Sequence, residues 1–240
     1  MITDLKKLWK QAFGDTDTFI DTFFSVAYSP DRCRYLTENG QLAAMLYWFD
    51  CDYQGKKIAY LYAVATEEAH RGNGFCRRLM DNTHRHLKGL GYAGAILVPA
   101  DEDLFRLYEK LGYRTCCYVT EFTCAAGEPI PLHAVSVSEY ASARRQLLPK
   151  NGVLQEGAAL ALLDASTALY AGDGFVLTAV VEDGTAHIQE LLGQADPAGI
   201  IAALGANNGH VRTPGNDTPF AMFLPFADTP APGYFGLALD

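Results

Sequence analysis

The chain of 240 residues is 49% hydrophobic and 20% charged, a composition that can bury a core and that excludes a disordered protein. Its formal net charge of −9 argues against general affinity for nucleic acid, because binding to phosphates needs a surplus of basic residues. No apolar run reaches the roughly 18–20 residues of a membrane span, and charges interrupt the N-terminal stretch, so we expect neither a membrane segment nor a signal peptide.

The first half alternates helices and strands in an order typical of a mixed sheet with helices on its faces. A hairpin is expected to turn at Glu38-Asn39-Gly40, and Asp101 is expected to cap a helix that Gly112 ends. The expected elements are helices at 3–13 and 16–27, strands within 33–50, a strand at 58–66, a helix up to about 88, a strand at 93–99, a helix at 101–112 and a strand at 113–124.

A break in composition at 125–131, AAGEPIP, divides the chain. Residues 1–125 carry 15 basic and 16 acidic side chains, whereas residues 126–240 carry 4 and 12, so the acidity lies in the second half. We predict a first domain at 1–125, a linker at 126–131 and a second domain at 132–240. The second half repeats the plan of the first, with helices at 136–148, 156–170 and 196–206 and strands at 174–183, 185–193, 209–213, 219–226 and 234–240.

The segment 70–78, HRGNGFCRR, joins an expected strand to an expected helix and has the features of an anion site. Unpaired N–H groups and the helix dipole attract negative charge at a helix start, and glycine lets a phosphate approach the main chain. The pattern is not a P-loop, because GxxxxGK(S/T) is absent, and it is not a dinucleotide fingerprint, because an arginine replaces the third glycine. Taken alone, the segment also fits an ordinary turn.

Together with its flanks, this segment resembles the pyrophosphate loop of the GNAT superfamily of acyl-CoA-dependent N-acyltransferases, (Q/R)-x-x-G-x-(G/A). The preceding strand, YLYAVATEEAH, takes the place of the family's cofactor strand, and LFRLYEKLGYR matches the family's helix end. Cys76 departs from the last loop position, and Asp101 stands where many relatives have asparagine. The resemblance covers about residues 3–124 and implies an α+β GNAT fold. The second half is then a degenerate GNAT-like domain without a loop, in a tandem layout resembling the enhanced-intracellular-survival type.

The resemblance implies acetyl-CoA as co-substrate and transfer of its acetyl group to a primary amine. In the family, main-chain groups of the cofactor strand bind pantetheine and amides of the loop bind the pyrophosphate. Carried over, the strand residues are Val64, Ala65 and Thr66, and the loop residues are Arg71, Gly72, Asn73, Gly74, Phe75 and Cys76.

Tyr108 matches the position where many members place the acid that protonates the leaving thiolate, although packing on a leucine stripe would also explain it. No general base is obvious. The candidates are Glu67, Glu68, Glu121, a water chain and the carboxylates at Asp240, where members of the enhanced-intracellular-survival family place a chain-terminal carboxylate.

Three interpretations stay open. The first is an N-acetyltransferase, the second a non-catalytic acyl-CoA binder or sensor, and the third a thiol enzyme that uses Cys76 or Cys51. The acceptor is expected to be a small-molecule or peptide amine, and the acidic second half favours a cationic one. Aromatic residues at 45–53, beside Asp50 and Asp52, either line an acceptor pocket or belong to the core.

The six cysteines lack the paired spacing of a zinc site and of a disulfide framework. Without an export signal, this use of cysteine favours reduced thiols and a cytoplasmic location. We expect no metal site, and nothing in the sequence indicates the oligomeric state.

Overall fold

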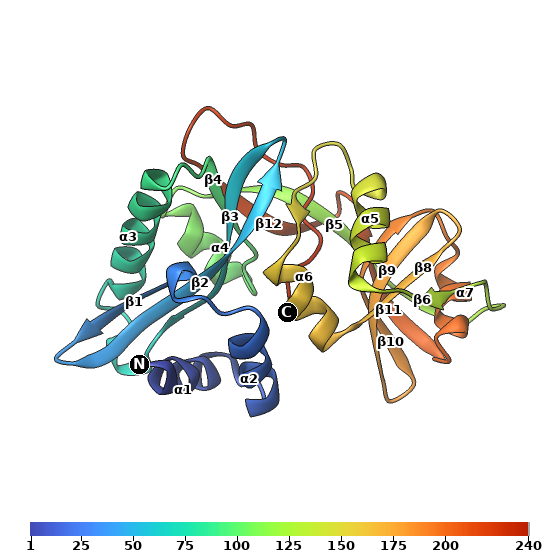
Figure 1. The fold of residues 1–240 in the computed structure, drawn as a ribbon, viewed down its shortest axis with the longest axis horizontal. Coiled ribbons are helices and arrows are strands. Elements are labelled where there is room, and N and C mark those ends of the chain that lie inside the picture. The colour runs from blue at the N-terminus through green and yellow to red at the C-terminus, as the bar shows by residue number, and fades with distance from the viewer. Residues whose placement is uncertain (240) are drawn as a thin grey trace.

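A computed structural model describes residues 1–239 of the chain, and in this range twelve strands form one mixed sheet with helices packed on its faces (Figure 1). The expected elements of the first half are confirmed with small shifts at their ends. They are α1 (Ile2–Phe13), α2 (Asp17–Val26), β1 (Cys33–Glu38), β2 (Gln41–Tyr53), β3 (Lys56–Thr66), α3 (Phe75–Gly89), β4 (Gly94–Leu97), α4 (Glu102–Glu109) and β5 (Arg114–Ala125), with short 3-10 turns at Pro30–Arg32 and Glu68–His70.

The second half also follows most of the expected plan, with two corrections. The helix expected at 156–170 ends at Ser166, because Thr167 is extended and the next residues pair with β9. The strand expected at 234–240 is wrong for the described residues, which form only a bridge from Tyr234 to Gly152. The elements are β6 (His133–Ala134), α5 (Val137–Leu147), β7 (Leu154–Gln155), α6 (Ala158–Ser166), β8 (Ala168–Gly172), β9 (Phe175–Glu182), β10 (Thr185–Gly193), α7 (Pro197–Ala203), β11 (Asn208–Pro214) and β12 (Thr218–Pro225).

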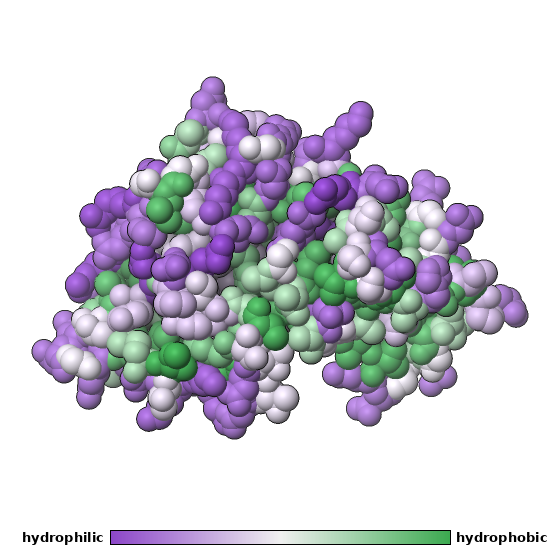
Figure 2. All heavy atoms as spheres, viewed as in Figure 1, coloured by the Kyte–Doolittle hydropathy of each residue, from purple (hydrophilic) through white to green (hydrophobic). Residues whose placement is uncertain are grey.

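Both faces of the first half's sheet are covered, which explains the continuous apolar run of β2. Tyr47 and Phe49 face α1 and α2, where Trp9 and Phe23 lie in the same cluster. The alternate residue, Trp48, belongs to the opposite cluster with the apolar side chains of α3. Figure 2 shows hydrophobic side chains reaching the surface mainly along the middle of the molecule, with hydrophilic ones along its rim.

Strand β12 lies between β4 and β5 and is antiparallel to both, so residues 218–225 complete the sheet of the first half. Gly94 of β4 makes this approach feasible, because the ring of Phe223 occupies the space that a Cβ would need. The boundaries 1–125, 126–131 and 132–240 stay a prediction about folding units. Strand pairing crosses them at β2–β7, β4–β12, β5–β12 and β5–β11.

Among residues 1–239, none of the helices combines the length and the apolar character that crossing a membrane requires. Within the same residues, no three side chains of the metal-ligating types come together as a candidate site.

His84 makes the folded state sensitive to acid. Its Nε2 lies 2.7 Å from the Tyr113 hydroxyl, its ring packs on Phe226, and burial lowers its pKa from 6.5 to about 4. The unfolded chain therefore takes up the proton more readily between these values. We predict that the free energy of unfolding falls as pH decreases from 6.5 to 4, by up to about 3 kcal/mol.

Urea denaturation at a series of pH values measures this decline. His84→Gln, which cannot titrate, is expected to flatten it, while His187→Gln at an exposed position leaves it unchanged. An equal slope in the His84 variant would contradict the assignment.

Candidate functional site

The site begins where β3 parts from β4. The two parallel strands pair only at Ala59 and Tyr60, although β3 continues to Thr66. In this unpaired stretch Ala63 has a φ of 49°, and the register with β2 shifts at the same place. A bulge of this kind bends its strand and breaks the regular pairing, so the bulge is the local cause of the opening.

A cavity of about 670 Å³ fills this opening. Its walls come from β3, β4 and α4 on one side and from α1, α2, α6 and the second half's sheet on the other. The lining residues used below are Asp15, Val64, Tyr108, Glu121, Gln189, Arg212, Ala238 and Leu239.

The predicted loop stands exposed before α3. Gly72 and Gly74 have φ values of 76° and 77°, a left-handed conformation that side chains rarely adopt, and Gly74 caps α3 without a side-chain hydrogen bond. No acceptor among the described residues takes a hydrogen bond from the amides at 72–76. The amide of Arg71 was also expected to bind the pyrophosphate, but it donates to Glu68 O at 3.1 Å. The loop therefore presents consecutive free donors at a helix start, an arrangement suited to phosphate.

The three residues expected to bind pantetheine differ in accessibility. Val64 lines the cavity. Ala65 is buried and pairs with Met45, while Thr66 is partly exposed and its carbonyl accepts a bond from the Arg71 side chain. Of the three residues predicted to bind pantetheine, only Val64 thus lines the cavity.

Tyr108 lies in the last turn of α4 and lines the cavity. Only 6% of its surface is exposed, and burial raises the pKa of the phenol, as do nearby Cys76 and Asp101. Its ring also packs on Tyr113. Tyr108 therefore belongs to the core and reaches the cavity, where it stays protonated at neutral pH.

The C-terminal segment reaches the same cavity. The hydroxyls of Tyr60 and Tyr62 donate to the main-chain oxygens of Ala238 and Leu239 respectively. Both of these acceptor residues line the cavity. Asp240 lies outside the described residues, so its catalytic role stays a prediction.

Among the other candidate bases, Glu121 lines the cavity and pairs with Arg212 at 2.8 Å. Glu67 instead caps the 3-10 turn and contacts His70 at 2.8 Å, and it does not line the cavity. Asp15, in the turn between α1 and α2, does line it and accepts a 2.6 Å bond from the Trp9 indole. The sequence carries no motif that singles out Asp15.

The remaining alternatives fit the structure less well. Burial raises the pKa of the Cys51 and Cys76 thiols, which disfavours the thiolate that a nucleophile needs. Tyr47 and Phe49 are core residues, and Asp50 pairs with Arg32 at 2.7 Å, so the stretch 45–53 serves packing.

Comparison with known proteins bears on the first half of the chain through a family model and on most of the chain through its fold. Residues 1–116 match the family of acetyltransferase (GNAT) domains. No curated protein matches the chain.

Three solved structures illustrate the likeness. A probable N-acyltransferase from Enterococcus faecalis is 17% identical with a TM-score of 0.69, over 93% of this chain and 70% of the other. Eis1 from Mycobacterium abscessus is 13% identical with a TM-score of 0.64, over 88% and 63%. A tandem GNAT protein from the clavulanic acid biosynthesis pathway is 8% identical with a TM-score of 0.56, over 95% and 96%.

At these identities the three structures show a shared fold, which extends over most of this chain. The matched residues 1–116 include the loop, β3, Tyr108 and part of the lining of the cavity. Residues 1–116, just under half of the chain, are thus similar to GNAT acetyltransferase domains, and the fold of the chain resembles that of a tandem GNAT protein.

Proposed function

We propose that this protein is an N-acetyltransferase that moves an acetyl group from acetyl-CoA to a primary amine. The observation that carries the proposal is that the loop, Tyr108 and the cavity adjoin one another. Free amides at 72–76 lie at the start of α3, Cys76 of that helix adjoins Tyr108, and Tyr108 lines the cavity where β3 leaves β4.

In this proposal the diphosphate of acetyl-CoA binds the amides of Gly72 to Cys76, with Arg77 and Arg78 adding positive charge at the exposed start of α3. Pantetheine follows the unpaired edge of β3 at Val64 to Thr66 and occupies the place of a neighbouring strand. The bound co-substrate supplies the acetyl thioester at the end of the cavity near Tyr108.

The reaction is a direct transfer. The amine nitrogen forms a bond to the thioester carbonyl, a tetrahedral oxyanion develops, and a main-chain N–H of β3 stabilises it. The C–S bond then breaks as the Tyr108 hydroxyl gives its proton to the departing thiolate, and the proton that the amide nitrogen loses returns through solvent to restore the phenol. Because an alkylammonium has a pKa of about 10.4, a base has to take a proton from the amine first. We propose Asp240 for this role, since the two residues before it line the cavity, with Glu121 as the second candidate.

A cationic acceptor fits the outer part of the site. Asp15, Glu121 and Arg212 line the cavity, and a second hollow of about 600 Å³ shares Glu121 and Arg212 with it. This hollow continues over the open face of β9–β11 and adds Glu182 and two stacked imidazoles, His187 and His210. The carboxylates outnumber the guanidinium, which favours an amine carrying positive charge.

The central test is calorimetry with CoA, together with thiol release from acetyl-CoA over a panel of amines. We predict that Gly74→Val weakens CoA binding at least tenfold, because a β-branched residue cannot hold φ near 77° and the amides lose their direction. Gly91→Val is the control, since Gly91 is exposed, has a φ of 81° and lies at the other end of α3. Equal affinity in both variants would contradict the phosphate site, and CoA binding without turnover on any amine would favour a non-catalytic binder.

Tyr108→Phe tests the acid. We expect kcat to fall about 100-fold or more, the range that general acids contribute, with unchanged affinity for CoA. Tyr113→Phe is the matched control, because Tyr113 is a buried neighbour that does not line the cavity. Full turnover in the Tyr108 variant would exclude the assigned role.

Asp15→Asn tests recognition of a cation. The amide oxygen can still accept the Trp9 bond, so the change removes charge while keeping the hydrogen bond. We predict a rise in KM of about tenfold for a cationic amine, consistent with the loss of one ion contact of roughly 1.4 kcal/mol. Asp17→Asn, at an exposed position paired with Lys10, should leave KM unchanged. If both variants behave alike, Asp15 does not bind the acceptor.

A further inference from the structure

The C-terminal segment Tyr234–Leu239, called here the tail, is buried without being part of the sheet. Its residues contribute no strand, and only Tyr234 forms a bridge, with Gly152. Phe235 and Leu237 nevertheless have exposed fractions of 0% and 1%. Because the tail has no regular strand pairing, individual hydrogen bonds from neighbouring groups have to fix its position.

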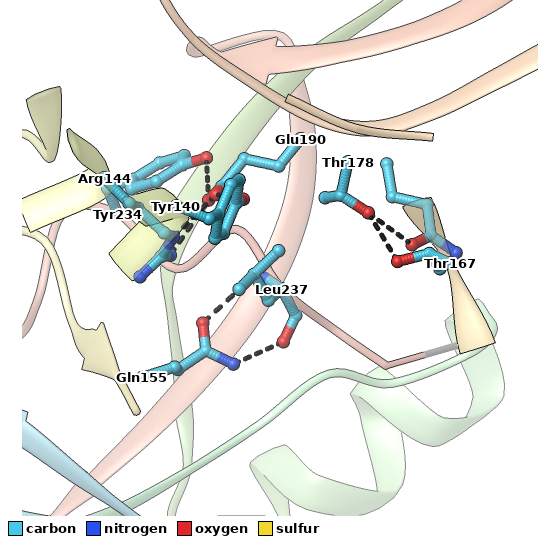
Figure 3. A network of polar contacts seen from close by, with 9 residues as sticks. Tyr140, Arg144, Gln155, Thr167, Thr178, Glu190, Tyr234 and Leu237 are labelled. Carbon is cyan, nitrogen blue, oxygen red and sulfur yellow. Dashed lines mark hydrogen bonds and ion pairs between the residues drawn. The ribbon is translucent and has the colours of Figure 1, made fainter. Parts of the chain in front are cut away.

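These groups come from the second half at one end of the tail. The amide of Val153 donates to Tyr234 O at 2.9 Å. The buried side chain of Gln155 binds both main-chain groups of Leu237, donating to its oxygen at 2.5 Å and accepting from its amide at 3.2 Å (Figure 3).

Glu190 of β10 is the centre of the strongest attachment. Its carboxylate, fully buried, accepts bonds from Arg144 Nε at 2.7 Å and Arg144 Nη2 at 3.0 Å (Figure 3). It also accepts from two tyrosine hydroxyls, Tyr140 of α5 at 3.1 Å and Tyr234 of the tail at 2.8 Å. Burial and the negative charge of Glu190 raise the pKa of both tyrosines, which remain donors.

Gly236 shows how closely the tail passes this centre. A Cβ at this position would collide with Glu190 Oε1 and with the Tyr234 hydroxyl. The absence of a side chain therefore lets the main chain lie directly on the Tyr234–Glu190 hydrogen bond. Any displacement of that bond moves the chain above it.

The other end of the tail lies in the cavity of the first half. Ala238 and Leu239 line that cavity and bind the hydroxyls of Tyr60 and Tyr62 of β3. The tail thus connects a charged centre inside the second half to the wall of the candidate active site, over six residues.

We propose that Glu190, acting through Tyr234, is a positioning residue that holds the tail as the cavity wall and sets its place for acetyl transfer. This inference rests on the proposed function. The Arg144–Glu190 pair fixes the carboxylate, and Tyr234 transmits its position to the tail. Replacing a buried ion pair by apolar residues is often neutral for stability, so the presence of this pair is weak evidence of a purely stabilising role.

The two tyrosines provide a matched experiment. Tyr234→Phe and Tyr140→Phe each remove one buried hydroxyl and one bond to the same carboxylate, but only the first lies on the tail. We expect Tyr234→Phe to lower kcat at least tenfold with unchanged CoA affinity, and to speed hydrogen exchange of the amides at 235–239 at least tenfold. Tyr140→Phe is expected to leave both quantities within twofold of the native protein.

Equal turnover and equal exchange in the two variants would overturn the inference, as would a loss of turnover in both that follows their loss of stability in urea. Gly236→Ala provides a second route, because its Cβ forces the tail off Glu190 and is expected to reproduce the Tyr234→Phe effects. The exchange measurement needs no substrate. If native protein acetylates no amine, the proposed function fails, while unchanged exchange in both tail variants rejects the positioning role itself.

Discussion

The parting of β3 from β4 is the constraint on which the rest of the structure depends. Each strand keeps a partner on its far side, β2 for β3 and β12 for β4, so the opening between them does not unravel the sheet. The bulge at Ala63 turns the free part of β3 away, and the main-chain groups exposed there have to bind water or a ligand. The cavity, the exposed loop and Tyr108 all lie around this one interruption in pairing.

Two segments of the second half pack against the first half and complete it. It has no loop of its own, yet it supplies β12, which pairs with β4 and β5, and the tail, whose end lies on β3. Arg212 of β11 also pairs with Glu121 across the β5–β11 junction. The sheet of the second half thus acts as a frame for the first, and its buried Arg144–Glu190 pair lies where the returning chain passes.

The sequence predicted what depends on local pattern. The hairpin turn at Asn39-Gly40, the capping Asp101 and the glycine-containing turn before α3 are legible in a few consecutive residues, and the structure contains each of them. Residues 168–170 were expected to form the end of a helix, but pairing with β9 makes them part of strand β8. The tail alternates like a strand yet finds side-chain partners instead. Asp15 and the Arg144–Glu190 pair could not be predicted, because their contacts join positions without periodic relation to one another.

The late position of β12 has a consequence for how the chain folds as it is made. About 90 residues separate β5 from β12, which at cellular rates of synthesis is a delay on the order of 5 to 20 seconds. During that interval β4 and β5 emerge from the ribosome with unpaired edges, the state most exposed to aggregation and to chaperone capture. A nascent chain therefore has no finished first-half sheet until β12 has been translated, so the walls of the cavity can assemble only after the second half has emerged.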